Sequence, residues 1–389
     1  MKIYQQKVLV IIGSLDVGGT EKHLTRVLPA LNTDSRQIRV VCFRKGGALA
    51  EVLRSKGVEV KCPDFSKQSY GRLKFSRVTT VILAIGFLAR EFLSYKPDVV
   101  HYFLPEAYIL GGLLSTVLGT PYRVMSRRSR NFYQQRSPIT RIERLLHGRM
   151  DRILTNSTAN LTDLKSEGVS EDRLILCYNG IDSTEYDVVA SQREMPSWLP
   201  IENGDIVVTC VANLIPYKGH ADIISALKIL ENNRMIGGGR RVKILFVGRD
   251  SGIQQELESK AIRAGVRDQL VFLGSRTDVG EILAVSDIGI LASHEEGMSN
   301  ALLEYMCFSL PIVATDVGGN RETLGDAGRL VPAASPDLMA SALAELCNDT
   351  SLARSSGERA RHRVEDQFPL CQTIKIYSEL YDSFRKQPI

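Results

Sequence analysis

The sequence lacks any long hydrophobic run. Its longest apolar stretch, Val78 to Ala89, is well short of the ~20 residues that a helix needs to span a bilayer. The apolar run near the N-terminus, Val8 to Ile12, is too short for the core of a signal peptide and leads to no plausible cleavage site. We therefore expect a cytoplasmic protein without a transmembrane helix.

Cysteines and catalytic motifs are also sparse. The seven cysteines are odd in number and form no C-x-x-C pair, so reduced thiols in a core are expected. The chain contains no D-x-D, H-E-x-x-H, G-x-S-x-G or Walker A sequence. These absences disfavour a dedicated metal site, a hydrolase triad and a P-loop NTPase.

The composition is that of an ordinary folded protein. Hydrophobic residues make up 44% of the 389 residues and charged residues 24%. A chain of this length is expected to form two domains. The net charge of +5 is mild, and without a nucleic-acid motif we expect no nucleic-acid partner.

Short β-branched runs alternate with helical stretches along the whole chain. This alternation is typical of parallel strands joined by crossover helices, so the expected class is α/β. The strands expected in the first half are Lys7–Gly13, Ile38–Phe43, Val58–Cys62, Asp98–Phe103, Tyr122–Ser126, Arg152–Thr155 and Arg173–Cys177. Those expected in the second half are Ile206–Ala212, Val242–Gly248, Gln269–Gly274, Asp287–Leu291, Ile312–Thr315 and Arg329–Val331.

A break in this rhythm separates two lobes. Ser183 to Gly204 carries prolines and no sustained period, which marks a linker. We therefore divide the chain into an N-terminal lobe, residues 1–185, and a C-terminal lobe, residues 186–364. Apolar residues recur every three or four positions in the tail, residues 365–389, which is expected to form a helix that closes one of the two lobes.

The most informative segment runs from Ser286 to Pro332, where a strand, a loop, a helix, a second strand and a glycine loop are expected. Glu296 falls in the loop after the first of these strands, where open parallel sheets bind ligands. Ser299 or Asn300 is placed to cap the helix. The free N–H groups at that helix start could hold a phosphate.

Glu304 lies in the body of this helix among mainly apolar neighbours. A carboxylate there needs hydrogen-bond donors, and a ribose diol offers two hydroxyls. The alternative is that Glu304 is a solvated surface residue and Glu296 a capping acid.

Two further loops follow expected strands. Lys218 precedes Gly219 at a loop-to-helix junction, where an ammonium group could meet phosphate oxygens. Gly18 and Gly19 follow the first strand and would let the backbone approach a ligand. They do not form a G-x-G-x-x-G fingerprint, so a dehydrogenase is disfavoured. A plain surface lysine and an ordinary tight turn are the alternatives.

His101 and a run of arginines complete the candidates. His101 ends an expected strand at the carboxyl edge, either as a functional residue or as a buried, satisfied histidine. Nine arginines stand between Arg123 and Arg152, against Glu143 and Asp151. They could line a cleft between the lobes, face anionic lipid headgroups or form a solvated helix face.

Together these residues resemble the retaining glycosyltransferases of the group-1 or family-4 type, which have the GT-B fold. The most specific match is an E-x7-E element, Glu296 to Glu304, followed by Gly318-Gly319 and Glu322. Further matches span nearly the whole chain and comprise the Gly18-Gly19 loop with Glu21, Asn156-Ser157, Asn179-Gly180-Ile181-Asp182 and Lys218-Gly219.

The resemblance implies two Rossmann-like lobes that face each other across a cleft, with the last helix crossing back to the N-terminal lobe. It implies transfer of a sugar from a nucleotide-diphosphate sugar to an acceptor hydroxyl, with retention of the anomeric configuration and without a metal or other cofactor. Glu304 is similar to the ribose-binding glutamate of the family, Glu296 to the one that faces the donor sugar, and Lys218 to the diphosphate-binding lysine. The implied catalytic residues are Glu296, Lys218 and His101.

The other implied donor contacts are Asn213, Arg249, Gly297, Met298, Ser299, Asn300, Gly18 and Gly19. Two departures from the family pattern are visible. Asn213 stands where an arginine is common, with Arg249 as a substitute charge, and Phe103 stands where many members carry a second histidine. Acceptor contacts in the N-terminal lobe are expected from Arg127, Arg128 and Arg130.

The expected partners are a nucleotide sugar, a sugar or lipid-linked sugar acceptor, and an anionic membrane surface at the inner face of the cytoplasmic membrane. The expected role is assembly of cell-surface polysaccharide or glycolipid, and the oligomeric state stays open. A sugar-nucleotide epimerase and a non-catalytic nucleotide-sugar-binding scaffold are the alternatives. An epimerase needs acid and base groups on both faces of the sugar, whereas the carboxylates and the lysine gather in the C-terminal lobe.

Overall fold

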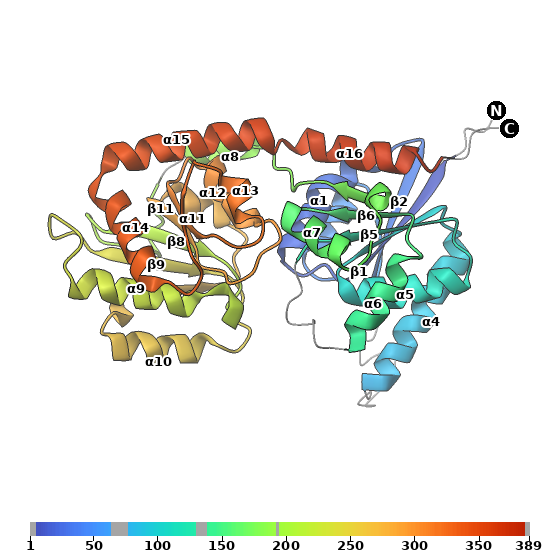
Figure 1. The fold of residues 1–389 in the computed structure, drawn as a ribbon, viewed down its shortest axis with the longest axis horizontal. Helices are drawn as coiled ribbons and strands as arrows, with labels where there is room; N and C mark the ends of the chain where they lie inside the picture. Colours follow the sequence, from blue (N-terminus) through green and yellow to red (C-terminus); the bar gives the residue numbers. More distant parts are fainter. Residues whose placement is uncertain (1–4, 64–76, 130–137, 192–193, 386–389) are drawn as a thin grey trace. The chain divides into compact units, whose positions relative to one another are not determined.

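The computed structural model describes residues 5–63, 77–129, 138–191 and 194–385. The chain divides into two units, each built on one sheet (Figure 1). The first unit is Met1–Gly180 together with Leu370–Ile389, and the second is Ile181–Pro369. In the described ranges, every pair of neighbouring strands in the two sheets is parallel.

The first unit contains a seven-stranded sheet in the order β3-β2-β1-β4-β5-β6-β7. Its strands are β1 (Gln6–Ser14), β2 (Arg36–Lys45), β3 (Glu59–Lys61), β4 (Val99–Phe103), β5 (Tyr122–Arg127), β6 (Arg152–Thr155) and β7 (Leu174–Leu176). Its helices are α1 (Gly19–Leu31), α2 (Leu49–Ser55), α4 (Arg77–Tyr95), α5 (Pro105–Val117), α6 (Pro138–His147), α7 (Thr158–Ser166), η2 (Glu171–Arg173) and α16 (Leu370–Asp382). The strand order reverses between β1 and β4, where open parallel sheets bind ligands.

The second unit contains a six-stranded sheet in the order β10-β9-β8-β11-β12-β13. Its strands are β8 (Ile206–Val211), β9 (Val242–Val247), β10 (Leu270–Gly274), β11 (Ile288–Leu291), β12 (Ile312–Thr315) and β13 (Arg329–Val331). Its helices are α8 (Thr184–Ser191), η3 (Pro216–Lys218), α9 (His220–Asn232), α10 (Gln254–Ala264), η4 (Arg267–Gln269), α11 (Val279–Ala284), α12 (Asn300–Cys307), α13 (Asn320–Leu324), α14 (Pro336–Asn348) and α15 (Thr350–Gln367). Here the order reverses between β8 and β11.

The first sheet is covered by helices on both faces, which is why its strands are almost continuously apolar. Along β1, Val8, Val10 and Ile12 belong to a core with α1, α2 and α16. The alternate residues Leu9 and Ile11 belong to a core with α4, α5 and α6. Alternation of side chains along a strand therefore assigns the two helix layers to opposite faces.

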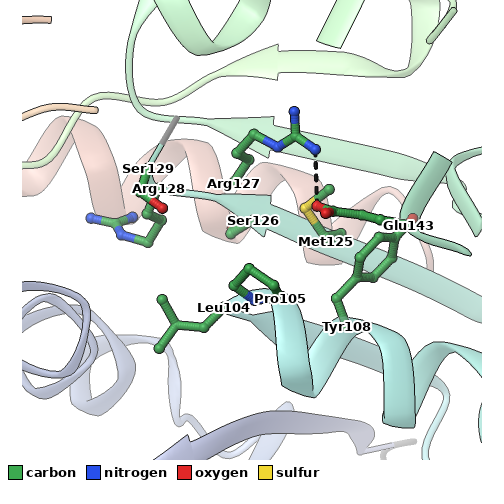
Figure 2. Close-up of a pocket in the computed structure, with 9 residues that line it drawn as sticks. All are labelled: Leu104, Pro105, Tyr108, Met125, Ser126, Arg127, Arg128, Ser129 and Glu143. Carbon is green, nitrogen blue, oxygen red and sulfur yellow. Dashed lines mark hydrogen bonds and ion pairs between the residues drawn. The ribbon is translucent and has the colours of Figure 1, made fainter. Parts of the chain in front are cut away.

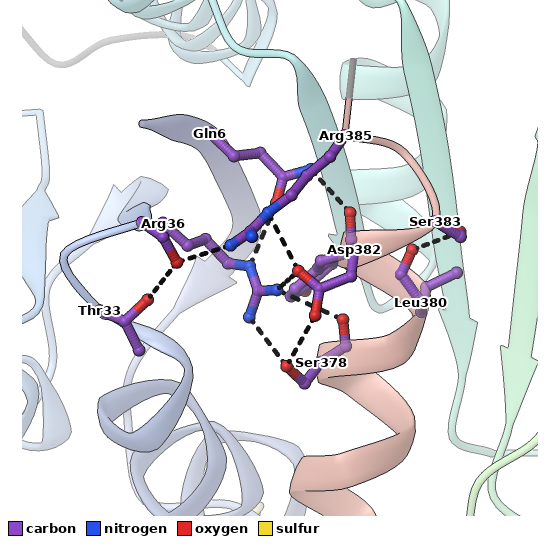
Figure 3. Close-up of polar contacts among 10 residues, drawn as sticks. Gln6, Thr33, Arg36, Ser378, Leu380, Asp382, Ser383 and Arg385 are labelled. Carbon is purple, nitrogen blue, oxygen red and sulfur yellow. Dashed lines mark hydrogen bonds and ion pairs between the residues drawn. The ribbon is translucent and has the colours of Figure 1, made fainter. Parts of the chain in front are cut away.

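The last helix, α16, packs on the first unit. Arg36 is buried, and its guanidinium contacts Oδ1 of Asp382 at 2.6 Å and Oε1 of Gln6 at 3.1 Å (Figure 3). The amide of Gln6 in turn donates to the carbonyl oxygen of Tyr381 at 2.7 Å. These bonds join the start of β1 and β2 to the C-terminal end of the chain.

The thirteen strands predicted from the sequence all form, with ends that differ by at most about two residues. Two boundaries differ from the sequence-based division. The second unit begins at Ile181 rather than at residue 186, because α8 forms within the expected linker and packs on α11. The tail helix begins at Leu370 rather than at residue 365, because α15 extends to Gln367 and Pro369, which has no N–H group, disfavours helical geometry at Phe368.

Candidate active site

The candidate donor residues of the second unit lie in the loops that follow neighbouring strands of the sheet, or in the helices η3 and α12 that follow these loops. These loops come after β8 (212–215), β9 (248–253), β11 (292–299) and β12 (316–319). Because the strands are parallel, all four loops lie at the same carboxyl edge of the sheet. The structure thus brings together side chains that are widely separated in the sequence.

Two glycines hold the loop after β11 in place. Gly219 has φ +70°, and a Cβ at this position would lie 1.9 Å from the carbonyl oxygen of Ala292. Gly318 has φ +53°, and a Cβ there would lie 1.8 Å from the carbonyl oxygen of Glu296. Because only glycine accepts both the left-handed geometry and the close backbone approach, these positions fix the loop that carries Glu296.

Lys218 and Glu296 form the charged centre of this edge. Nζ of Lys218 lies 2.6 Å from Oε1 of Glu296, and Oγ of Ser293 donates to the same oxygen at 2.7 Å. Both charged side chains are mostly buried. Burial disfavours the ammonium charge, but the neighbouring carboxylate outweighs it and raises the pKa of Lys218. A fixed cation is therefore present at the loop-to-helix junction.

Glu304 is only 3% exposed, so it is not the solvated surface residue of the alternative interpretation. It belongs to α12, whose N-cap residue Ser299 makes no side-chain capping bond. Met298 and Ser299 are buried and Asn300 is half-buried. The first N–H groups of a helix lack partners within the helix and favour anions, so this helix start suits a phosphate.

Asn213 joins two of these loops. Its Oδ1 accepts a hydrogen bond from the backbone N–H of Arg249 at 3.0 Å, and Leu214 N–H donates to the carbonyl oxygen of Arg249 at 2.9 Å. The side chain of Arg249 is exposed. Asn213 thus orders the loop that carries Arg249.

The glycine turn of the first unit also opens a helix. Gly18 is the N-cap residue of α1, and Gly19 is its first residue. A Cβ on Gly18 would lie 2.4 Å from Oε2 of Glu21, so the carboxylate of Glu21 folds over this turn. The turn lies at the carboxyl edge of the first sheet.

His101 lies in the interior of the first unit. Its Nδ1 is 2.8 Å from the hydroxyl of Tyr381, and its Nε2 is 2.8 Å from Oγ of Ser126. Burial, and then the charge of Arg128, lower the pKa of His101 to about 3. Both ring nitrogens are occupied and the side chain is fully buried, so the structure favours the satisfied interior histidine over a catalytic one.

The expectation that Arg127 contacts an acceptor does not match its position. Its guanidinium contacts Oε1 of Glu143 at 2.9 Å (Figure 2). It also contacts Oε1 of Glu167 at 2.7 Å, and the side chain is buried. Although burial disfavours the charge, these two carboxylates raise the pKa of Arg127. His147 extends the network, with Nε2 at 2.9 Å from Oε2 of Glu167. Arg127 therefore stabilises the first unit from inside.

Arg128 is placed differently. It lines a pocket at the ends of β4 and β5 (Figure 2), whose walls are Leu104, Pro105, Tyr108, Met125, Ser126, Arg127, Arg128, Ser129 and Glu143. Its guanidinium donates to Asn179 and also bonds the hydroxyl of Tyr377, and the charge of Glu21 acts on it as well. Burial lowers the pKa of Arg128. Arg130, the third predicted acceptor contact, lies outside the described residues.

Two residues of the site were not anticipated from the sequence. Ser293 is buried and orients Glu296. The hydroxyl of Tyr305 accepts from Val211 N–H at 2.6 Å and donates to the carbonyl oxygen of Ile290 at 3.2 Å, which ties β8 to β11. The sequence offered a signal for Ser293, because a polar residue that follows an apolar strand is a candidate site residue. It offered none for Tyr305, which looks like an ordinary apolar residue of a helix.

In the part of the chain that the structure describes, no three histidine, cysteine, aspartate or glutamate side chains group in the way a metal ion requires. None of the helices within the described ranges is long and apolar enough to cross a bilayer.

Two Rossmann-like units, with a charged site at the carboxyl edge of the second sheet, are the architecture of the GT-B fold. Residues 205–349 match the family described as Glycosyl transferases group 1, and residues 17–185 match Glycosyltransferase Family 4. The chain belongs to the group-1 glycosyltransferases. Its reaction class is transfer of a sugar from a nucleotide sugar.

Known proteins similar to this chain support the assignment. The capsular polysaccharide biosynthesis glycosyltransferase CapM of Staphylococcus aureus is 21% identical over 387 residues, 94% of this chain and 97% of the relative. The N-acetylgalactosamine-N,N'-diacetylbacillosaminyl-diphospho-undecaprenol 4-alpha-N-acetylgalactosaminyltransferase of Campylobacter jejuni is 25% identical over 92% of this chain and 95% of the relative. The structure of Anabaena HepE in complex with UDP-glucose has the same fold, with a TM-score of 0.81 and 22% identity over 97% of this chain and 100% of HepE.

Proposed function

We propose that the protein transfers a sugar from a nucleotide-diphosphate sugar to a hydroxyl of a lipid-linked sugar acceptor, with retention of the anomeric configuration. The observation that carries the proposal is the Lys218–Glu296 pair beside the start of α12. Support for the acceptor class comes from the C. jejuni relative, whose name includes a diphospho-undecaprenol. The CapM name supports a role in cell-surface polysaccharide assembly. We propose that the protein acts at the cytoplasmic side of the membrane.

In this proposal the second unit holds the donor. Lys218 and the N–H groups at the start of α12 bind the diphosphate, and the carboxylate of Glu304 accepts hydrogen bonds from the ribose hydroxyls. Glu296 accepts hydrogen bonds from the donor sugar. The remaining proposed donor contacts in the second unit are Asn213, Arg249, Gly297, Met298, Ser299 and Asn300.

The proposed reaction needs no protein nucleophile. The bond between the anomeric carbon and the diphosphate oxygen breaks, and the acceptor oxygen attacks from the same face. The acceptor proton passes to the leaving phosphate. Positive groups fixed in advance stabilise the charge that grows on the diphosphate. Lys218 and the helix start supply them, so we propose that no metal is required.

We place the acceptor against the pocket of the first unit that Arg128 lines. The hydrogen bonds of this guanidinium to Asn179 and Tyr377 are to neutral side chains, and a guanidinium favours an anionic group, such as the phosphate of a lipid-linked sugar. Replacement of Arg128 by glutamine is therefore expected to raise the KM for the acceptor and to leave nucleoside diphosphate affinity unchanged. An unchanged acceptor KM would remove Arg128 from the site.

The experiment that tests the proposed function starts with a thermal-shift screen of nucleotide sugars. A donor at 100 times its dissociation constant is expected to stabilise the protein by about 2.7 kcal/mol. Proton NMR of the product formed with a lipid-linked acceptor then reports the anomeric configuration, and EDTA is expected to leave activity intact. An inverted product contradicts retention, and loss of activity in EDTA that magnesium or manganese restores contradicts metal independence. Donor binding without nucleotide release with any acceptor would indicate the scaffold.

A further inference from the structure

Exposed apolar side chains gather on three helices of the first unit. Within the described ranges, nine of the fifteen large hydrophobic residues that are exposed lie on or directly after α4, α5 and α6: Val81, Ile82, Ile85, Leu93, Leu113, Val117, Leu118, Ile142 and Leu145. Val117 and Leu145 are the most exposed, at 83% and 77%. Single exposed apolar residues are ordinary, but a contiguous patch marks an interaction surface.

Helix α4 is apolar on both sides. Its inner side packs Leu88 and Phe92 into the core of the first unit. Its outer side presents Ile82, Ile85 and Leu93 to the exterior. A helix that faces water on one side normally carries polar residues there. The outer side of α4 is therefore suited to an apolar environment.

The three helices are neighbours, and we call their exposed side the α4–α6 face. Helix α5 contacts both α4 and α6 (Figure 1). All three cover the face of the first sheet opposite the one that α1 and α16 cover. The exposed apolar residues thus belong to one layer of the molecule.

The charges on the α4–α6 face are mainly positive. Its exposed basic residues are Arg90, Arg141, Arg144 and Arg149. The acidic residues of the three helices are engaged: Glu91 pairs with Arg39, Glu106 with Arg44 and Glu143 with Arg127. Among the residues that the structure describes, none forms an ion pair with these four arginines. Apolar side chains beside such charges match the headgroup layer of an anionic bilayer.

We propose that the α4–α6 face docks on the surface of an anionic lipid membrane. The apolar side chains of α4, α5 and α6 enter the boundary between headgroups and acyl chains, and the arginines contact lipid phosphates. The proposal rests on the proposed function, because a lipid-linked acceptor is presented at such a surface. The arginines of this face are distinct from Arg127, whose side chain is paired inside the first unit.

A second copy of the chain fits this face less well. In a two-fold symmetric dimer the same patch lies on both sides of the interface. The arginines of α6 would then face arginines of the partner, and like charges repel. An anionic bilayer instead attracts these arginines, because its lipid phosphates carry the opposite charge.

The experiment is flotation of the full chain with phosphatidylcholine vesicles that contain phosphatidylglycerol or lack it. Binding is expected only with the anionic vesicles and is expected to fall at about 1 M salt. Leu145→Glu should weaken it tenfold or more, and Arg141→Ser with Arg144→Ser roughly fivefold per arginine. Ile262→Glu is the matched control, because Ile262 is 66% exposed on α10 of the second unit. This control should bind like the native chain.

The outcomes separate this proposal from the proposed function. Turnover with a water-soluble acceptor analogue should be equal in the native chain and in Leu145→Glu, because Leu145 belongs to neither the proposed donor site nor the acceptor pocket. Vesicle binding without turnover on any acceptor would overturn the proposed function and keep the docking face. No binding of the native chain to anionic vesicles at low salt would overturn the docking face. A dimer of the native chain in sedimentation analysis that the Leu145→Glu substitution dissociates would also overturn the docking face. The α4–α6 face would then bind a second copy of the chain rather than a membrane.

Discussion

Lys218 and Glu296 are 78 residues apart in the sequence, yet Nζ of the one lies 2.6 Å from Oε1 of the other. The contact depends on the adjacency of β8 and β11, because Lys218 follows the first strand and Glu296 the second. The carboxylate keeps the lysine charged in a mostly buried position, as the raised pKa of Lys218 indicates. A diphosphate would thus meet a cation that is already in place.

Replacement of Lys218 by alanine should lower turnover by about 10²-fold or more, because one donor to the developing charge on the diphosphate is lost. The measurement is kcat with saturating donor. Lys228→Ala is the control, since Lys228 is exposed on α9 of the same unit. Turnover of Lys218→Ala within twofold of the native value would remove this lysine from the mechanism.

Replacement of Gly219 by alanine tests the contact that fixes the loop after β11. Gly265→Ala is the matched control: both residues have left-handed geometry, with φ +70° and φ +76°, but a Cβ on Gly265 meets nothing within 4 Å. The control should lose only about 1–2 kcal/mol of unfolding free energy. Gly219→Ala should lose more, because its Cβ clashes with Ala292 O, and it should also weaken donor binding. Equal losses in urea unfolding would mean that the contact with Ala292 is dispensable.

The buried His101 predicts a specific loss of stability in acid. Its pKa of about 3 in the folded chain lies below the value of about 6.5 expected for an unfolded chain. Above a pH of about 6.5 the ring of His101 is neutral in both the folded and the unfolded chain. As the pH falls below about 6.5, only the unfolded chain gains the proton, so the unfolding free energy drops by about 1.4 kcal/mol per pH unit towards pH 3.

Urea unfolding between pH 7 and pH 5 measures this slope. His101→Asn should flatten it by one proton, although the variant is less stable overall. His362→Asn, at an exposed position on α15, should keep the native slope. Identical slopes in all three proteins would contradict a neutral interior His101.

Cys62 should react with iodoacetamide at neutral pH. A hydrogen bond from Cys42, its buried neighbour on β2, lowers the pKa of Cys62 to about 7, and the thiolate is the reactive form. The labelling rate should rise as the pH passes through 7, and Cys42→Ala should slow it by removing the donor. Burial raises the pKa of Cys177 and Cys210 to about 12, so both should stay unlabelled. Mass spectrometry of the labelled peptides measures the rates. Faster labelling of Cys210 than of Cys62 would contradict the hydrogen bond from Cys42 to Cys62.

The strands and the donor loops could be predicted from the sequence because their signals are local. Each strand is a short apolar run between polar turns, and Glu296, Lys218 and Gly318 stand directly after such runs. Parallel strands then force these loops to the same sheet edge. The burial of Glu304 also follows from its apolar neighbours on one helix.

The arginine-rich segment could not be resolved in this way, because its contacts are not local. Arg127 reaches Glu143 on α6 and Glu167 after α7, and neither spacing reveals a pair in the sequence. His101 likewise depends on Tyr381, which lies 280 residues further on. Charge runs in a sequence thus do not separate interior ion pairs from surface arginines such as Arg141.

The most direct test of the donor site is calorimetric titration of nucleoside diphosphate into the native chain and into Glu304→Ala. Loss of a charged acceptor for the ribose hydroxyls, worth about 1.5–3 kcal/mol, should raise the Kd roughly tenfold to a hundredfold. Glu281→Ala, at an exposed position on α11, should bind like the native chain, and Glu296→Gln should keep most of the affinity while it loses turnover. Native affinity in a folded Glu304→Ala variant would contradict the placement of the nucleotide at this edge of the second sheet.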